Sequence, residues 1–306
     1  MRLLVIGAGV LGCNLAANLY EAGKNVTLLA RGEWYSNLQK RGLVIKHQLF
    51  PRVVRYKIGL TNQLKKTEEY DAIFICVQFT QLDEIVTLLS ENVSQNIIFI
   101  GNNLRPREYA ERLKGKNVMF GFALSAGHRE ANAVVSIDLK KITIGDLKGE
   151  TDNQRLIKHI FHRTRYQVKY EPDIESYLLC HAAIVLPACY ACYCADGDLK
   201  KLAANHAFLQ QVINANIELY RVMKKLGYQL LPEVLNNYHS SSYRWTVFWF
   251  YKIMAATPLG KICASDHAMS ALPEMAALAA EVNQLIAESG LETPNYRELQ
   301  NHQKYI

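Results

Sequence analysis

Apolar and polar positions in the first half of the chain follow two patterns. Continuous apolar runs, typical of parallel strands buried on both faces, occur at residues 3–6, 26–30, 71–77, 96–100 and 117–122. Helical spacing occurs at 82–89, where four apolar side chains share one face, and a second helix is expected at 105–113. Two later strands are expected at 134–137 and 141–145, with an antiparallel pairing considered. Strands that alternate with helices predict a doubly wound α/β domain with a mostly parallel sheet.

The pattern changes near residue 170, after which nearly every segment has helical spacing. Glu171-Pro172-Asp173 predicts a turn followed by the start of a helix. The helices expected beyond it span residues 174–194, 199–226, 232–237, 242–256 and 273–289. The sequence therefore predicts an α/β domain over residues 1–168 and an all-α domain over residues 169–306.

The first apolar run leads directly into a glycine-rich turn, which is followed by a helical stretch and the second apolar run. Strand, glycine turn, helix and strand occur in this order in a dinucleotide-binding βαβ unit. The helix N-terminus of such a unit offers N–H groups and a partial positive charge to a phosphate. The candidate cofactor-binding residues in this turn are Gly7, Ala8, Gly9, Val10, Leu11 and Gly12.

Each glycine of the turn has an expected role. Gly7 would allow the tight turn, Gly9 the close approach of a pyrophosphate, and Gly12 the close packing of helix on sheet. The alternative is a tight strand–helix turn in a domain that binds no nucleotide.

Arg31, at the end of the second apolar run, bears on the choice of dinucleotide. NAD-binding units usually carry an Asp or Glu near this point, which binds the ribose 2′-hydroxyl. An arginine can instead bind a 2′-phosphate bidentately, and the nearest acid, Glu33, is expected to begin the next helix. The sequence favours NADP(H) over NAD(H); the alternative for Arg31 is a solvated surface charge.

Composition and charge narrow the function classes. The chain has 306 residues, half of them apolar, and a net charge of +7. Its basic residues are scattered, so no nucleic-acid-binding patch is expected, while the modest positive charge suits an anionic cofactor and a carboxylate substrate. We expect no apolar stretch as long as a membrane span and no signal peptide, and therefore a cytoplasmic protein.

Seven cysteines are expected to be free thiols in such a protein. Cys180 and His181, with Cys189, Cys192 and Cys194, could suggest zinc, but four converging ligands are not evident. We prefer the interpretation that these side chains pack in a core, and we expect no metal. The aromatic segment 243–251 favours core or dimer packing, and a bulky aromatic substrate pocket is the alternative. A homodimer through the helical domain is accordingly considered.

The sequence resembles the ketopantoate reductase (2-dehydropantoate 2-reductase) family nearly end to end. The resemblance rests on the GAGVLG turn and on short motifs at residues 30–32, 41–43, 142–146, 217–219, 225–227, 273–275 and 290–295. It implies reduction of a 2-keto acid by NADPH and a place in pantothenate biosynthesis. It also implies that the active site lies between the two domains.

The resemblance assigns roles to three further residues. Asn102, after the strand at 96–100, matches an asparagine that contacts cofactor or substrate. Ala126 is expected beside the nicotinamide half of the cofactor, after a strand that ends near Phe122. Glu274, within Pro273-Glu274-Met275, matches a glutamate that binds the substrate.

The family's proton-donating lysine has no counterpart. Anchored on Pro187, the expected lysine and two asparagines fall on Leu178, Ala182 and Leu186. His181, three residues after Leu178, is the candidate replacement, because histidine can act as an acid near neutral pH; a core histidine is the alternative. A serine expected twelve residues before Glu274 falls on Ile262, with Ser265 near it.

Two functions are therefore weighed. The first is an NADPH-dependent reductase of ketopantoate or of a less polar 2-keto acid. The second is a dinucleotide-binding protein without catalysis, such as a redox sensor or an assembly subunit, which has lost the lysine.

Overall fold

The computed structural model describes residues 1–48 and 51–301. The chain divides into two compact units, Met1–Ile174 and Glu175–Ile306. The boundary expected at residues 168–169 falls inside strand β10 (Gln167–Tyr170). Because β10 pairs with β9 (Val134–Gly145), it belongs to the first unit, and the division comes after it.

The described part of the first unit forms one ten-stranded sheet, with the order β4-β3-β9-β8-β7-β6-β1-β2-β5 and β10 beside β9. The remaining strands are β1 (Arg2–Ile6), β2 (Asn25–Leu29), β3 (Leu43–His47), β4 (Arg52–Tyr56), β5 (Gly59–Thr61), β6 (Ala72–Ile75), β7 (Asn96–Ile100) and β8 (Asn117–Arg129). Seven neighbouring pairs are parallel, and β3–β4 and β8–β9 are antiparallel. The mostly parallel sheet is confirmed.

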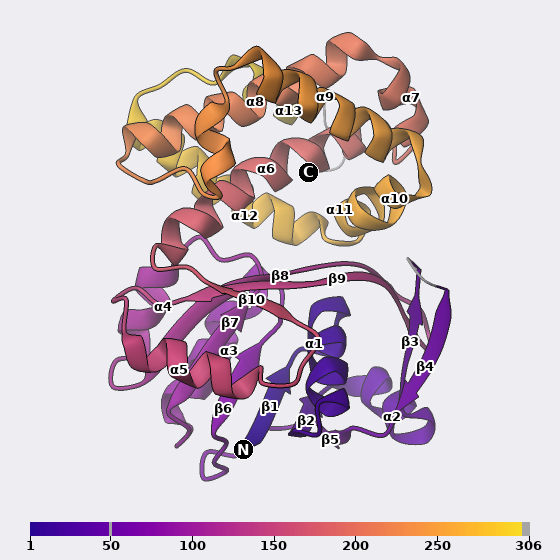
Figure 1. Ribbon diagram of the computed structural model, residues 1–306, viewed down its shortest axis with the longest axis vertical. Coiled ribbons are helices and arrows are strands. Elements are labelled where there is room, and N and C mark those ends of the chain that lie inside the picture. The colour runs from indigo at the N-terminus through magenta and orange to yellow at the C-terminus, as the bar shows by residue number, and fades with distance from the viewer. Residues whose placement is uncertain (49–50, 302–306) are drawn as a thin grey trace. The chain divides into compact units, whose positions relative to one another are not determined.

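Helices pack against this sheet (Figure 1). They are α1 (Val10–Glu21), α2 (Gly32–Arg41), α3 (Leu82–Glu91), α4 (Pro106–Arg112) and α5 (Thr151–Ile160), with a short 3₁₀ turn, η1 (Phe79–Gln81), before α3. All four residues of β6 are buried, and so are four of five in β1 and β7. Continuous apolar runs form these central strands because both faces of the sheet are covered.

The expected strands at 134–137 and 141–145 are one strand, β9, which pairs antiparallel with β8. The polar residues between the two apolar runs lie within β9 near an irregularity of the pairing, where the register shifts between Ala123 and Ser125. The expected end of β8 near Phe122 is also wrong, because the strand continues to Arg129.

The second unit is helical in its described residues. Its elements are α6 (Ile174–Cys194), α7 (Leu199–Ala204), α8 (His206–Lys225), η2 (Glu233–Asn237), α9 (Ser241–Ala256), α10 (Pro258–Gly260), η3 (Lys261–Ser265), α11 (Asp266–Ser270), α12 (Leu272–Ser289) and α13 (Pro294–Asn301). The helix expected at 199–226 is two helices. Asn205 ends α7, and its side chain accepts a hydrogen bond from the Phe208 N–H, which caps the start of α8.

Helix α6 is the apolar helix of this unit. Its most apolar 18 residues have a mean hydropathy of 1.6, so by length and composition the helix could cross a membrane. The expectation that no apolar stretch has this length is therefore wrong. Of these 18 residues, 67% are buried inside the protein. A buried core helix of a globular domain passes the same test of length and composition.

Asp146, directly after β9, forms hydrogen bonds with the following turn, with α5 and with β10. Its carboxylate accepts hydrogen bonds from the backbone N–H groups of Lys148 and Gly149, at 2.7 and 2.6 Å, and from the Asn153 side chain. The Tyr170 hydroxyl donates a further bond. Burial alone would raise the pKa of the Asp146 carboxyl, but these hydrogen bonds outweigh it and lower the pKa below its usual value.

We expect Asp146→Asn to lower the free energy of unfolding by about 2–3 kcal/mol at neutral pH, the magnitude typical of hydrogen bonds to a charged group. Because the pKa of Asp146 is lower in the folded than in the unfolded protein, its ionised form stabilises the fold at pH values above the unfolded pKa of about 3.9. This contribution is lost as the pH falls through the folded pKa. Urea unfolding of both proteins tests this. The difference should shrink below about pH 4; a difference independent of pH would contradict it.

Candidate dinucleotide-binding site

The turn after β1 requires glycine at its first and last positions. Gly7 has a φ of +104°, and a Cβ there would lie 2.5 Å from the Cys76 carbonyl oxygen. A Cβ on Gly12 would lie 1.9 Å from the carbonyl oxygen of Gly7. Both contacts are with backbone atoms that cannot move aside. Without a side chain, Gly7 lets the turn pass close to the residue after β6, and Gly12 lets α1 lie close to the turn after β1.

Gly9 differs from the other two glycines. It is the N-cap of α1 with a φ of −85°, so its backbone conformation is open to any residue. A Cβ at Gly9 would meet no atom within 4 Å. The fold therefore does not require glycine here, and the position leaves open space at the start of α1, where a dinucleotide-binding unit admits a phosphate.

The ends of three neighbouring strands meet at this turn. Strands β1, β6 and β7 are parallel neighbours, so their carboxyl ends share one edge of the sheet. The Cβ position of Gly101, after β7, lies 3.8 Å from both Leu11 Cδ1 and the Val77 carbonyl oxygen. The structure thus brings the glycine turn and the Gly101-Asn102 segment together.

Arg31 follows the adjacent strand β2 and is the N-cap of α2. Its guanidinium Nη1 lies 3.0 Å from Glu84 Oε1 on α3, and these two side chains are 56% and 70% exposed. Exposed ion pairs of this kind contribute little to stability. The pair therefore holds Arg31 weakly, and an anion with two or more oxygens could displace Glu84.

Ala126 lies inside β8, opposite Ile137 of β9, and not in a loop after the strand. Its neighbour Ser125 accepts a hydrogen bond of 2.6 Å from the Asn14 side chain on α1. The Asn14 side-chain oxygen, Oδ1, accepts a hydrogen bond from the Ser136 hydroxyl at 3.1 Å. This buried polar link fixes the part of β8 that carries Ala126 against α1.

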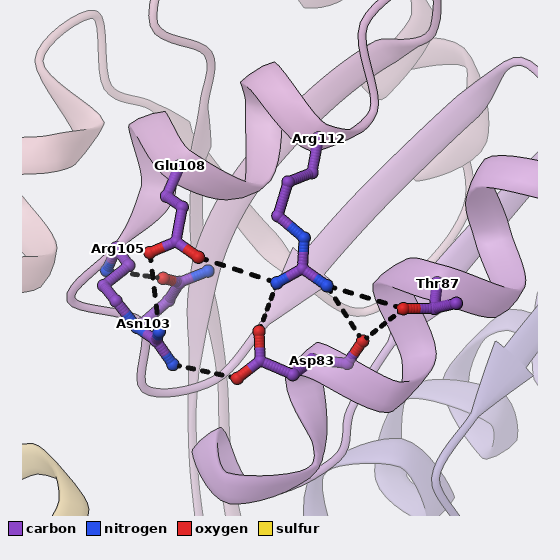
Figure 2. A network of polar contacts seen from close by, with 6 residues as sticks. All are labelled: Asp83, Thr87, Asn103, Arg105, Glu108 and Arg112. Carbon is purple, nitrogen blue, oxygen red and sulfur yellow. Dashed lines mark hydrogen bonds and ion pairs between the residues drawn. The ribbon is translucent and has the colours of Figure 1, made fainter.

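The segment after β7 is held by a network of polar contacts (Figure 2). The Asn103 side chain accepts a hydrogen bond from the backbone N–H of Arg105 at 3.0 Å. Figure 2 shows the Arg105 and Arg112 guanidinium groups on either side of the Asp83 carboxylate. The network joins α3 to α4 and so supports the turn that carries Asn102.

The two arginines determine the charge of Asp83. Burial would raise the pKa of its carboxyl, but the hydrogen bonds and positive charges of Arg112 and Arg105 outweigh burial and lower the pKa. Asp83 is therefore ionised at neutral pH and keeps both guanidinium groups bound.

In the helical unit, α6 carries an apolar side chain at each position where the resemblance predicts a lysine or asparagine. Leu178, Ala182 and Leu186 are all buried, at 2% exposure or less. His181 is half-buried on the same helix. The replacements are thus core residues, and His181 is the polar side chain of this part of α6.

Glu274 lies in the first turn of α12 and is buried, with 4% exposure. Together with burial and Cys192, its charge raises the pKa of the Cys189 thiol on α6. Cys189 lies eight residues beyond His181, about 12 Å along the helix. Glu274 is therefore close to the C-terminal half of α6, whereas His181 lies in the N-terminal half of this helix.

Ser265 is a buried residue near this region whose role the sequence left open. It ends a π-helical turn, η3, and its hydroxyl donates a hydrogen bond of 3.4 Å to the Gly197 carbonyl. Single π turns are frequent at functional sites. Ser265 lies nine residues before Glu274, whereas the family resemblance implies a serine twelve residues before it.

The cysteines of α6 do not gather a metal-binding set. Burial raises the pKa of the Cys192 thiol to about 12, whereas a metal ligand must lose its proton. Among the residues that the structure describes, no group of three or more His, Cys, Asp or Glu could hold a metal ion.

Comparison with known proteins identifies the first unit. Residues 3–149 match the family model described as ketopantoate reductase PanE/ApbA. These residues form a ketopantoate reductase family domain. The resemblance noted in the sequence is therefore confirmed for the domain that contains the glycine turn. A comparison with curated proteins gave no match.

Solved structures resemble the chain over nearly its whole length. A 2-dehydropantoate 2-reductase from Geobacter metallireducens GS-15 has a TM-score of 0.81 at 17% identity, covering 99% of this chain and 98% of that one. A D-mandelate dehydrogenase, solved with NADH and anilino(oxo)acetate, has a TM-score of 0.80 at 14% identity, with 99% and 96% covered. A dimeric ketopantoate reductase from Staphylococcus aureus has 0.74 at 16%, with 99% of each covered. At these identities the likeness concerns the fold, which includes the helical unit.

Proposed function

We propose that this protein is an NADPH-dependent oxidoreductase that reduces a 2-keto acid, either ketopantoate or a less polar analogue. The observation that carries the proposal is the open space at Gly9. Gly7 and Gly12 are required by the fold, but Gly9 is not. The fold does not need glycine at this position, but a ligand that approaches the backbone would need it.

The residues of this edge suit a dinucleotide phosphate. The turn Gly7–Gly12 and the start of α1 would hold the pyrophosphate, and Arg31 would bind the 2′-phosphate once released from Glu84. Asn102 and Ala126 would contact the nicotinamide half. NADPH, when bound, would supply the hydride.

Two residues of the helical unit would take part in the chemistry. Glu274 would bind the substrate, and His181 would donate a proton to the carbonyl oxygen as the alcohol forms. The apolar surroundings at Leu178, Ala182 and Leu186 favour a substrate less polar than ketopantoate. The structures named as D-mandelate dehydrogenase support an aryl 2-keto acid as one member of the panel to be tested.

The proposal is tested by following NADPH oxidation with ketopantoate and a panel of aliphatic and aryl 2-keto acids. Turnover with at least one of them, together with saturable NADPH binding, is expected. Failure to bind either NADPH or NADH would reject the dinucleotide site itself.

Arg31→Ala is expected to weaken NADPH binding by about 10- to 100-fold, since charge-assisted hydrogen bonds contribute about 1.5–3 kcal/mol. NADH lacks the 2′-phosphate, so its affinity should not change. Glu84→Gln is the matched variant: it removes the competitor for Arg31 and should leave NADPH binding equal or tighter. Fluorescence titration of both nucleotides measures this. Equal losses for NADPH and NADH would contradict the role of Arg31.

A second function is a dinucleotide-binding protein without catalysis. The buried apolar residues at positions 178, 182 and 186 favour it, because the family's charged donor to the carbonyl oxygen is absent from α6. Saturable NADPH binding with no turnover on any keto acid would support this function over the first.

We also propose a homodimer through α9. Large apolar side chains are exposed along one side of this helix, at 41–66%: Trp245, Trp249, Phe250 and Ile253. Exposed apolar patches mark association surfaces, and the Staphylococcus aureus neighbour is named as dimeric. Light scattering should show a dimer that Phe250→Glu converts to a monomer, while Leu139→Glu, at an exposed apolar residue of the other unit, leaves it intact. A monomeric wild-type protein would reject this interface.

A further inference from the structure

A polar hollow lies within the helical unit, among α8, α9 and α13, which lie near one another in Figure 1. Its volume is about 240 Å³, smaller than the roughly 300–1,000 Å³ of pockets for drug-sized ligands. It is lined by Asn214, Ile217, Glu218, Arg221, Tyr238, His239, Arg244 and Asn295. The residues from α8 recur at helical spacing, so they share one face of that helix.

The acidic residue of the hollow is already engaged. Glu218 Oε1 accepts hydrogen bonds from the backbone and side-chain nitrogens of Asn295, at 3.2 and 2.5 Å. Glu218 Oε2 accepts one from the Tyr296 N–H at 3.0 Å. The carboxylate thus caps the N-terminus of α13, where a negative charge is favourable.

The two arginines have no such partner. Arg244 donates to the Asn214 side-chain oxygen at 2.5 Å, which is a neutral acceptor. Within residues 1–48 and 51–301, neither Arg244 nor Arg221 forms an ion pair. Two guanidinium groups therefore line one small hollow, and its one carboxylate, Glu218, bonds to the start of α13 and not to either of them.

The remaining polar groups add further donors. The His239 ring lies on the Tyr238 ring, with centroids 3.8 Å apart, and both line the hollow. An imidazole and a phenol can each donate a hydrogen bond to an oxygen. Paired guanidinium groups match the oxygens of a carboxylate or phosphate, which they bind bidentately.

We infer that this hollow is a binding site for a small oxyanion, a phosphate or carboxylate group on a compact molecule, with Arg221 and Arg244 as its main contacts. The site is built from the helical unit alone. It does not rest on the dinucleotide site or on any catalytic role.

Isothermal titration of the full-length protein with inorganic phosphate and, separately, with succinate tests the inference. Saturable binding of at least one anion is expected, weakened as ionic strength rises. Phosphate alone, succinate alone or both would each support the site and would identify the preferred group.

Arg221→Gln should weaken binding tenfold or more. Arg221 is exposed and makes no hydrogen bond to the described residues that this change would break, so the variant should fold normally. Arg244→Gln should weaken binding similarly, with a melting temperature measured because its bond to Asn214 is lost. Lys225→Gln removes the same charge from α8 outside the hollow and should bind like the wild type. Absence of saturable binding at millimolar anion, or equal losses in all three variants, would overturn the inference.

Discussion

Replacing Gly9 with valine is expected to reduce NADPH affinity by about 100-fold or more while leaving the protein folded. The side chain would occupy the open space at the start of α1 and separate a phosphate from the backbone N–H groups. The loss of two charge-assisted hydrogen bonds at about 1.5–3 kcal/mol each gives this magnitude. Because a Cβ at Gly9 meets no atom within 4 Å, we expect the free energy of unfolding to fall by less than about 1 kcal/mol.

Gly12→Ala is the matched variant. Its Cβ would lie 1.9 Å from the Gly7 carbonyl oxygen, so both the melting temperature and NADPH binding should fall. Calorimetry of binding and of thermal unfolding separates the two outcomes. A Gly9→Val protein that binds NADPH like the wild type would remove the main support for the dinucleotide site.

His181→Ala is expected to lower kcat for the best 2-keto acid by about 100-fold or more, the usual contribution of a general acid. NADPH affinity should stay unchanged, because the glycine turn and Arg31 belong to the other unit. The pH dependence of kcat gives an independent readout, since a general acid must be protonated to act. The limb of the profile due to His181 should disappear in His181→Gln.

Two outcomes would contradict this role. Unchanged turnover in both variants would identify His181 as a core histidine. A fall in NADPH affinity equal to the fall in kcat, with a lowered melting temperature, would indicate a structural role. The NADPH titration therefore keeps the test of His181 separate from the test of Gly9.

The central strands and their helices are predictable from the sequence because their local signals agree with the fold. Buried parallel strands need continuous apolar runs, and the runs in β1, β6 and β7 stand alone between helices of clear periodicity. The edge strand β4 and its neighbour β3 lack this signal. Charged residues interrupt the apolar ones in both, and the two strands are paired by tertiary contacts, which a single sequence does not reveal.

Two of the wrong expectations, the division of β9 and the single helix at 199–226, have local causes. Residues 138–141 of β9 are mostly polar, and this interrupts the apolar pattern without ending the strand. Residues 199–226 keep helical spacing through Asn205, and only the cap that its side chain forms shows that α7 ends there.

The candidate site was predictable where a role depends on the backbone. The tight turn at Gly7 and the close packing at Gly12 are confirmed by the positions that a Cβ would take. The pairing of Arg31 with Glu84 could not be predicted, because the two residues are 53 positions apart and meet through the tertiary fold. The roles of Glu274, His181, Asn102 and Ala126 stay predictions, since they depend on bound molecules.

The ends of the sheet bear on how the protein behaves at high concentration. Strands with unpaired edges can recruit another chain and start aggregation. Here β4 carries Arg52 and Arg55, β5 has only three residues, and β10 carries Lys169. Positive charge and short length are the features that discourage such pairing. The residues that most weakened the strand signal at β4 are thus the ones we expect to keep this protein in solution.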